Sequence, residues 1–154
     1  IRPPHQHGLL TPPWRVLWAQ YNEFYGRVGA TALSNEIIST TWNRFLDPSE
    51  PMQRLAAEHQ KHLVELTQFV FDRNTITVGN TCYLQDLFSQ PSMREKSIGR
   101  RLVAEFYERA KQAGTVGVYW HTHSSNNTAM RPYDRAATNT EFVFYRKTLS
   151  KKSI

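Results

Sequence analysis

The stretch YLQDLFSQPSMREKSIGRRLVAEFYERAKQAG, residues 83–114, determines how this chain is expected to fold. Its first third is rich in apolar residues and stops at Pro91, which predicts a strand. A charged loop follows, and apolar residues then recur at the spacing of one helix face until Gly114. The stretch therefore predicts a strand, a loop and a helix, with free backbone N–H groups where the loop enters the helix.

The sequence on either side extends this pattern to a whole domain. The expected strands are residues 1–3, 53–59, 62–71, 81–89, 116–122 and 141–147, and the expected helices are residues 11–26, 34–46, 98–113 and 126–137. Hairpin-linked strands followed by a strand–helix–strand crossover imply a mixed sheet with helices on both sides. We expect a single domain of the α+β (mixed α/β) class over residues 1–154.

Composition narrows the classes of function. An apolar content of 40% predicts a packed core, and no apolar run is long enough to span a membrane or to act as a secretory signal. The single cysteine, Cys82, cannot form an internal disulfide, which favours the cytoplasm. A net charge of +6 suits polyanionic ligands such as nucleotides. The basic residues are dispersed and no nucleic-acid-binding motif occurs, so we expect no nucleic-acid partner.

The first helix carries an aromatic stripe. Trp14, Trp18, Tyr21 and Tyr25 are spaced four, three and four residues apart, so they share one helix face. Such a stripe usually faces the core. The alternative is a partly exposed stripe that lines a substrate pocket.

The charged loop also has two interpretations. Cations at Arg94, Lys96, Arg100 and Arg101 could be ordinary surface charge, and Glu95 opposes them. Free N–H groups and the positive end of the helix dipole would instead favour a diphosphate at this point.

Two motifs in this order resemble a known family. Arg94-Glu95-Lys96-Ser97-Ile98-Gly99 and Asn126-Asn127-Thr128-Ala129 with Tyr133 resemble the two signatures of the GCN5-related N-acetyltransferases (GNAT). The flanking LWAQYNEFYG and FLDP are similar to the subgroup with diamine acetyltransferases and yeast histone and D-amino-acid acetyltransferases. The resemblance implies a mostly antiparallel mixed sheet of about six or seven strands with about four helices.

The resemblance also implies acetyl-coenzyme A as co-substrate. The residues it assigns to the cofactor are Leu87, Phe88, Arg94, Glu95, Lys96, Ser97, Ile98, Gly99, Arg100, Asn126, Ala129 and Tyr133. In the family a bulged strand offers backbone N–H groups to the thioester and opens a gap for the pantetheine arm. Here that strand is expected to be residues 82–89, with the amides of Leu87 and Phe88 nearest the thioester.

Tyr133 and Asp86 are the catalytic candidates. By resemblance, the Tyr133 phenol protonates the departing thiolate, although a helix tyrosine can also be a packing residue. Diamine-specific relatives carry Glu where this chain has Gln85, so a direct base there is excluded. Asp86 could accept a proton through water, hold a cationic amine or form a salt bridge. Ser97 and Pro132 depart from the family pattern: Ser97 replaces a glycine, and Pro132 is expected to kink the helix before Tyr133.

We expect direct transfer of an acetyl group to a primary amine of an amino acid, peptide, protein or small molecule within a ternary complex. Tyr21, Tyr25, Trp42 and Gln85 are the expected acceptor-binding residues. The alternatives are a polyamine or diamine acetyltransferase and a catalytically weak coenzyme A-binding module. An open sheet edge near the C-terminus suggests a homodimer.

His121 and His123 share one face of an expected strand end. They could hold a metal, or one could act as a base. No third ligand is spaced nearby, so we expect no metal.

Overall fold

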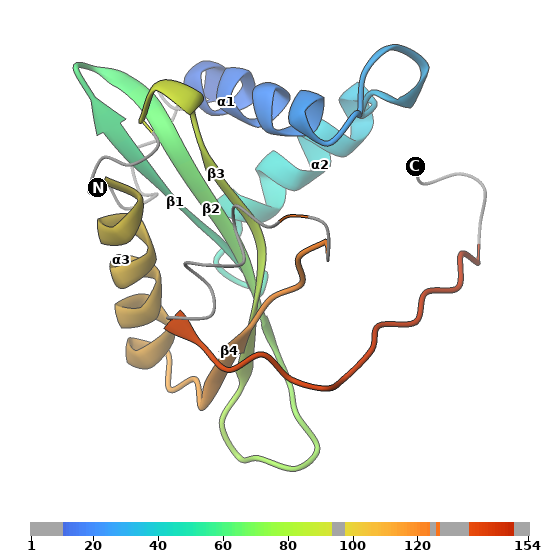
Figure 1. Ribbon diagram of the computed structural model, residues 1–154, viewed down its shortest axis with the longest axis vertical. Helices are drawn as coiled ribbons and strands as arrows, with labels where there is room; N and C mark the ends of the chain where they lie inside the picture. The colour runs from blue at the N-terminus through green and yellow to red at the C-terminus, as the bar shows by residue number, and fades with distance from the viewer. Residues whose placement is uncertain (1–10, 94–97, 124–125, 127–135, 150–154) are drawn as a thin grey trace. The chain divides into compact units, whose positions relative to one another are not determined.

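The computed structural model describes residues 11–93, 98–123, 126 and 136–149 (Figure 1). The chain divides into two compact units, residues 1–120 and 121–154. The elements of the first unit are α1 (Thr11–Phe24), η1 (Gly29–Thr31), α2 (Asn35–Leu46), β1 (Met52–His59), β2 (His62–Asp72), β3 (Thr81–Ser89), η2 (Pro91–Met93), α3 (Ile98–Gln112) and β4 (Gly117–Tyr119).

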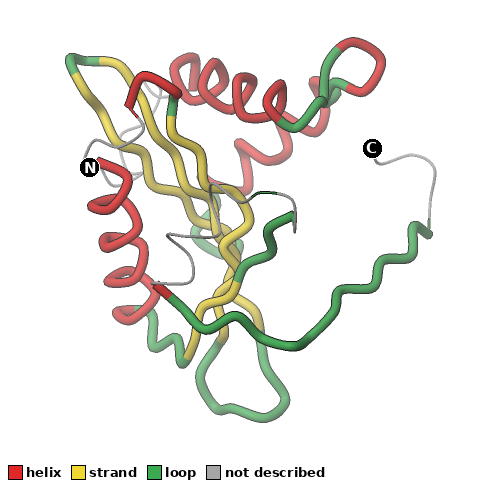
Figure 2. Tube along the Cα trace, viewed as in Figure 1, coloured by secondary structure: helices red, strands yellow, loops and turns green. Residues whose placement is uncertain are grey.

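The sheet is mixed, with strand order β1-β2-β3-β4. Strands β1, β2 and β3 are antiparallel neighbours, and β4 joins β3 in parallel after the crossover through α3. Figure 2 shows the three long strands side by side, with an extended loop between β2 and β3. The mixed α+β class predicted from the sequence is therefore confirmed.

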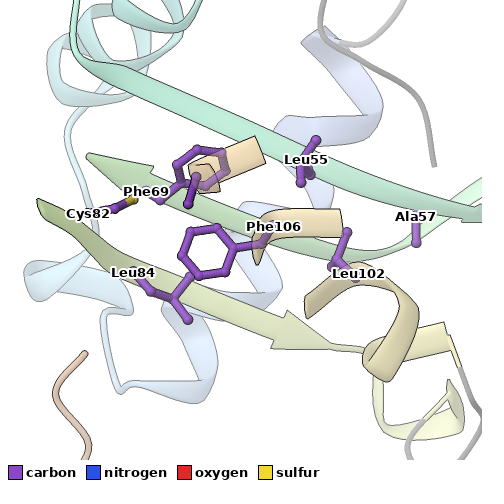
Figure 3. Packing of buried hydrophobic residues seen from close by; sticks show 8 residues of the cluster. Leu55, Ala57, Phe69, Cys82, Leu84, Leu102 and Phe106 are labelled. Atoms are coloured by element: carbon purple, nitrogen blue, oxygen red, sulfur yellow. The ribbon is translucent and has the colours of Figure 1, made fainter. Parts of the chain in front are cut away.

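Helices cover both faces of this sheet (Figure 1). On the α3 face, Leu102 and Phe106 are fully buried against the sheet. Phe106 lies beside Phe69 and Leu84, and Leu102 lies nearer to Leu55 and Ala57 (Figure 3). On the other face, Trp14, Leu17 and Trp18 of α1 pack with Phe45 of α2 and with the sheet. The long helices thus bury the apolar stripes that their sequences predicted.

Local signals fix the helix ends. The Ser34 side chain accepts a hydrogen bond from the Ile37 N–H at 3.3 Å and caps α2. Gly26 and Gly114 have φ of 73° and 72° beyond the last turns of α1 and α3. This left-handed conformation favours glycine, so the stop signal at Gly114 is confirmed, and Gly26 ends the expected helix 11–26 in the same way.

The element count differs from the expectation. The described residues contain four strands and three α-helices, against the six or seven strands and four helices expected. Residues 141–147 form no strand in the described structure. Strand β4 is shorter than the expected 116–122. The expected strand 1–3 and most of the expected helix 126–137 lie outside the described residues.

Candidate active site

A β-bulge at Gln85 distorts the middle of β3. Between two paired positions, β2 advances two residues, from Val70 to Gln68, while β3 advances three, from Tyr83 to Asp86. The extra residue bends its strand and increases the local twist. The side chain of Gln85 is exposed.

The bulge lies where β3 loses its second neighbour. The parallel pairing with β4 ends at Tyr83 opposite Tyr119, and no other described strand of the first unit pairs with the rest of β3. In Figure 1, β4 accompanies only one end of β3. Within the described part of the first unit, the second half of β3 therefore has no neighbouring strand on this edge, where an extended ligand could pair as a strand would.

Strand alternation distinguishes the two amides expected near the thioester. The Gln90 N–H donates to the Val64 carbonyl of β2 at 3.0 Å. Because N–H directions alternate along a strand, the Phe88 N–H also faces β2, and the Leu87 N–H faces the opposite, open edge. Of the two expected amides, Leu87 is the one that an extended ligand on this edge could reach.

Helix α3 begins close to this edge in sequence, at Ile98. Its first turn presents N–H groups without intrahelical partners, and the exposed Arg100 and Arg101 follow directly. Ile98 packs against the buried cluster of the α3 face, which anchors the helix start to the sheet. Residues Arg94, Glu95, Lys96 and Ser97 lie outside the described residues.

Asp86 lies on the α1 face of the bulged strand, and its side chain is buried, with 9% exposed. Its Oδ2 accepts a hydrogen bond from Gln68 Nε2 at 2.7 Å, and the Tyr21 hydroxyl donates a second one. Burial raises the pKa of Asp86, while the bonds from Tyr21 and Gln68 and the positive charge of Arg27 lower it in part. Asp86 is therefore a desolvated carboxyl held by two donors.

Tyr21 is buried and keeps its proton. Burial, together with the negative charge of Asp86 and the hydrogen bond to it, raises the pKa of Tyr21 well above the usual range of a phenol. Arg27 is fixed beside this pair, because its Nη1 donates to Asn22 Oδ1 at 2.9 Å. The ring of Tyr21 also lies 4.9 Å from that of Tyr25, which is half exposed.

Trp42, the fourth residue expected near the acceptor, packs into the cluster under α1 and α2. Its ring centroid lies 5.0 Å from that of Trp14, and the Arg54 guanidinium sits 4.0 Å from it. Burial lowers the pKa of Arg54 to about 10. Three of the four residues expected near the acceptor lie close to Asp86: Tyr21 bonds to it, Tyr25 contacts Tyr21, and Gln85 precedes it in the chain. Trp42 instead packs against Trp14 and Arg54.

The second unit carries the remaining candidates. The Asn126 N–H donates to the His123 carbonyl at 2.8 Å, in a turn. The His121 ring packs against Phe144 at 4.7 Å. Ala129, Pro132 and Tyr133 lie outside the described residues. Within the portion that the structure describes, no group of three or more His, Cys, Asp or Glu side chains could hold a metal ion.

Two buried polar residues of β2, Glu65 and Gln68, were not anticipated from the sequence. Both stand in HLVELTQFVF, a run of predominantly apolar residues. A charged or amide side chain in such a run is a signal of a buried polar group that needs partners. Gln68 supplies one bond to Asp86, and Glu65 lies on the opposite face, beneath α3.

Comparison with known proteins agrees with this geometry. The model of the acetyltransferase (GNAT) family matches residues 11–137, most of the chain. The chain belongs to the GNAT family. It is therefore an acetyl-transfer enzyme.

A curated relative of this GNAT enzyme is the D-amino-acid N-acetyltransferase HPA3 of Saccharomyces cerevisiae. The two are 31% identical over 137 residues, which is 87% of this chain and 82% of the relative.

Solved structures share the fold at lower identity. An aminoglycoside acetyltransferase from an uncultured soil metagenomic sample matches with a TM-score of 0.76 and 14% identity, over 91% of this chain and 90% of that one. The ribosomal-protein-alanine N-acetyltransferase of Brucella melitensis biovar Abortus 2308 matches with a TM-score of 0.70 and 14% identity, over 91% and 93%. AAC(6')-Iy in complex with a coenzyme A bisubstrate analogue matches with a TM-score of 0.74 and 14% identity, over 90% and 92%. In the described part of this GNAT chain, the helices are too short or too polar to cross a membrane.

Proposed function

We propose that this GNAT enzyme transfers the acetyl group of acetyl-coenzyme A directly to the primary amine of an amino acid or a similarly small amine. The observation that carries the proposal is the bulge at Gln85 combined with the loss of pairing beyond Tyr83. Together they leave, in the described part of the first unit, a strand edge without a neighbouring strand and close to a helix N-terminus, which suits a long ligand with an amide-containing arm and a diphosphate.

The residues present fit acetyl-coenzyme A. The Leu87 N–H on the open edge is placed to donate to a carbonyl, and the first turn of α3 with Arg100 and Arg101 suits the diphosphate. When bound, the cofactor supplies an activated acetyl thioester. A donor at the carbonyl oxygen stabilises the negative charge that develops there during attack by an amine.

Proton transfer is assigned to Tyr133 and Asp86. The Tyr133 phenol is proposed to give its proton to the leaving sulfur. Asp86 is proposed to receive a proton from the attacking amine through water, and its raised pKa improves it as an acceptor near neutral pH. Tyr21 and Gln68 then act as positioning residues, because both hydrogen-bond the carboxyl.

The acceptor assignment rests on two supports. The named activity of the yeast relative concerns a D-amino acid, which favours an amino acid acceptor here. The carboxylate of Asp86 is already engaged by Tyr21, Gln68 and the field of Arg27, so it is poorly placed to bind the distal ammonium groups of a polyamine. A polyamine acceptor would need further free carboxylates near the bulge.

Release of free thiol from acetyl-coenzyme A tests the proposal. D- and L-amino acids, short peptides and a polyamine are compared as acceptors, with turnover expected for the amino acids. Replacement Tyr133→Phe is expected to lower kcat by about 100-fold or more while the KM for acetyl-coenzyme A stays similar. Tyr145→Phe, at an exposed tyrosine of the same unit, is the matched control.

The possible results separate the alternatives. If the polyamine is the only acceptor that is acetylated, the proposed amino acid acceptor is wrong and the enzyme is a polyamine acetyltransferase. Tight cofactor binding without transfer to any amine, unchanged by Tyr133→Phe, would instead identify a binding module.

A further inference from the structure

Glu65 lies directly beneath the first turn of α3. It stands on β2 between Ala57 of β1 and Ser89 of β3, and only 1% of it is exposed. A Cβ at Gly99 would lie 3.4 Å from Glu65 Oε1 and 3.6 Å from the Ser89 hydroxyl oxygen. The absence of a side chain at Gly99 thus lets the helix N-terminus approach this carboxyl closely.

The buried Glu65 carboxyl receives few hydrogen bonds from the described residues. Ser89 donates one hydrogen bond to it, whereas Oε2 has no partner among the described residues. Burial raises the pKa of Glu65, and the bond from Ser89 only partly offsets this. The unpartnered oxygen distinguishes Glu65 from Asp86, which has two donors.

The described residues directly around Glu65 carry no charge. Its neighbours Ala57, Ser89 and Gly99, on β1, β3 and α3, are all uncharged. The cations of the first helical turn, Arg100 and Arg101, are exposed. Lys61 lies in the β1–β2 turn and His62 begins β2, and both are exposed. His59, two residues from Ala57 on β1, is partly buried, and the side chains of residues 94–97 are not described. The positive end of the α3 dipole is the remaining favourable field for a Glu65 anion.

A diphosphate and an ionised Glu65 would compete for that field. Both anions would occupy the same helix end within a poorly hydrated region, where repulsion between like charges is strong. Bound diphosphate therefore favours the neutral form of the carboxyl, whose proton can also bond to a neighbouring oxygen.

We propose that Glu65 is a proton-linked positioning residue, which supports the first turn of α3 and takes up a proton from solvent when a diphosphate binds there. This inference rests on the proposed function, because it assumes that the N-terminus of α3 receives the cofactor diphosphate. It adds a pH dependence of cofactor affinity that the acetyl-transfer steps do not require.

Calorimetry of coenzyme A binding tests this inference. Binding is measured between about pH 5 and pH 8 in buffers that differ in ionisation enthalpy, which counts the protons exchanged. On binding coenzyme A, the wild type is expected to take up a larger fraction of a proton than Glu65→Gln. This difference in proton uptake should be largest at the pH values where Glu65 is ionised in the free protein. Glu108→Gln removes the same charge from an exposed position of α3 and is expected to match the wild type.

The outcomes distinguish this inference from the function on which it rests. Binding with equal proton uptake in the wild type and in Glu65→Gln overturns the role of Glu65 and leaves the cofactor site intact. Absence of coenzyme A binding overturns both. If Glu65→Gln does not fold, carboxyl ¹³C NMR of the wild type decides: a buried glutamate that becomes protonated on adding coenzyme A supports the inference, and the lack of such a resonance overturns it.

Discussion

At the scale of single residues, the Tyr21–Asp86 pair couples stability to pH. The Tyr21 hydrogen bond favours the ionised form of Asp86, so its loss in Tyr21→Phe raises the pKa of Asp86 further. Because the pKa of Asp86 is higher in the folded than in the unfolded protein, the free energy of unfolding decreases as pH rises through the folded pKa, and this decrease is larger in the variant. We expect Tyr21→Phe to lower the free energy of unfolding by about 1.5–3 kcal/mol at neutral pH, and by less in acid where Asp86 is protonated.

Urea unfolding at several pH values measures this difference. Tyr25→Phe is the matched control, since Tyr25 lies on the same side of the helix end but is half exposed. It should change stability by only a few tenths of a kcal/mol, about the usual size for an exposed site. An equal loss for Tyr21→Phe at all pH values would contradict the coupling.

The sequence could not have revealed this pair. Tyr21 belongs to an aromatic stripe with the period of a helix, and that period correctly predicts burial of Trp14, Trp18 and Tyr21. The helical period carries no information on which strand residue accepts the hydrogen bond of the Tyr21 hydroxyl. Gln68 and Asp86 lie 18 residues apart and become neighbours only through the register of β2 and β3.

At the scale of elements, the bulge in β3 can be separated from the rest of the strand. Leu84 and Asp86 now lie on opposite faces of the sheet because of the extra residue between them. After deletion of Gln85 they would be adjacent and would still face opposite sides, so the packing under α1 and under α3 would keep its residues. The strand would straighten and its edge would move. We therefore expect stability to change little, while acetyl transfer falls by about 100-fold because the thioester is misplaced.

The matched control is Gln85→Ala, which keeps the extra backbone residue and removes only an exposed side chain. It should retain most of the activity, as measured by thiol release, if the backbone distortion is what matters. Equal losses in the two variants would instead assign the role to the amide side chain, in line with the expected contact of Gln85 with the acceptor.

Element types were largely predictable and irregularities were not. The spacing of apolar residues gave α2, α3 and the three long strands, because each buries one side against a neighbour. The resemblance led us to expect a bulge, but its position at Gln85 depends on the register with β2. The strand expected at 141–147 is not formed there, and its apolar run set only a tendency toward extended structure.

At the scale of the whole molecule, homodimerisation remains a prediction. Phe142, Val143, Phe144 and Tyr145 are four consecutive, largely exposed apolar residues. Such a segment is suited to pair with a second copy, which would cover it. We expect a dimer by light scattering at micromolar concentration, and a monomer for Phe144→Glu.

Thr148→Glu places the same charge in the same exposed segment without removing an apolar side chain. It should remain dimeric. A monomeric wild type would exclude the pairing outright.

Cys82 has a practical consequence for all the assays above. It is the chain's single cysteine, it is fully buried among Leu55, Phe69 and Phe106, and burial raises the pKa of its thiol to about 12. A protonated, sealed sulfur does not react with a disulfide reagent. The native protein therefore contributes no background colour, and any signal in a turnover experiment counts liberated coenzyme, molecule for molecule.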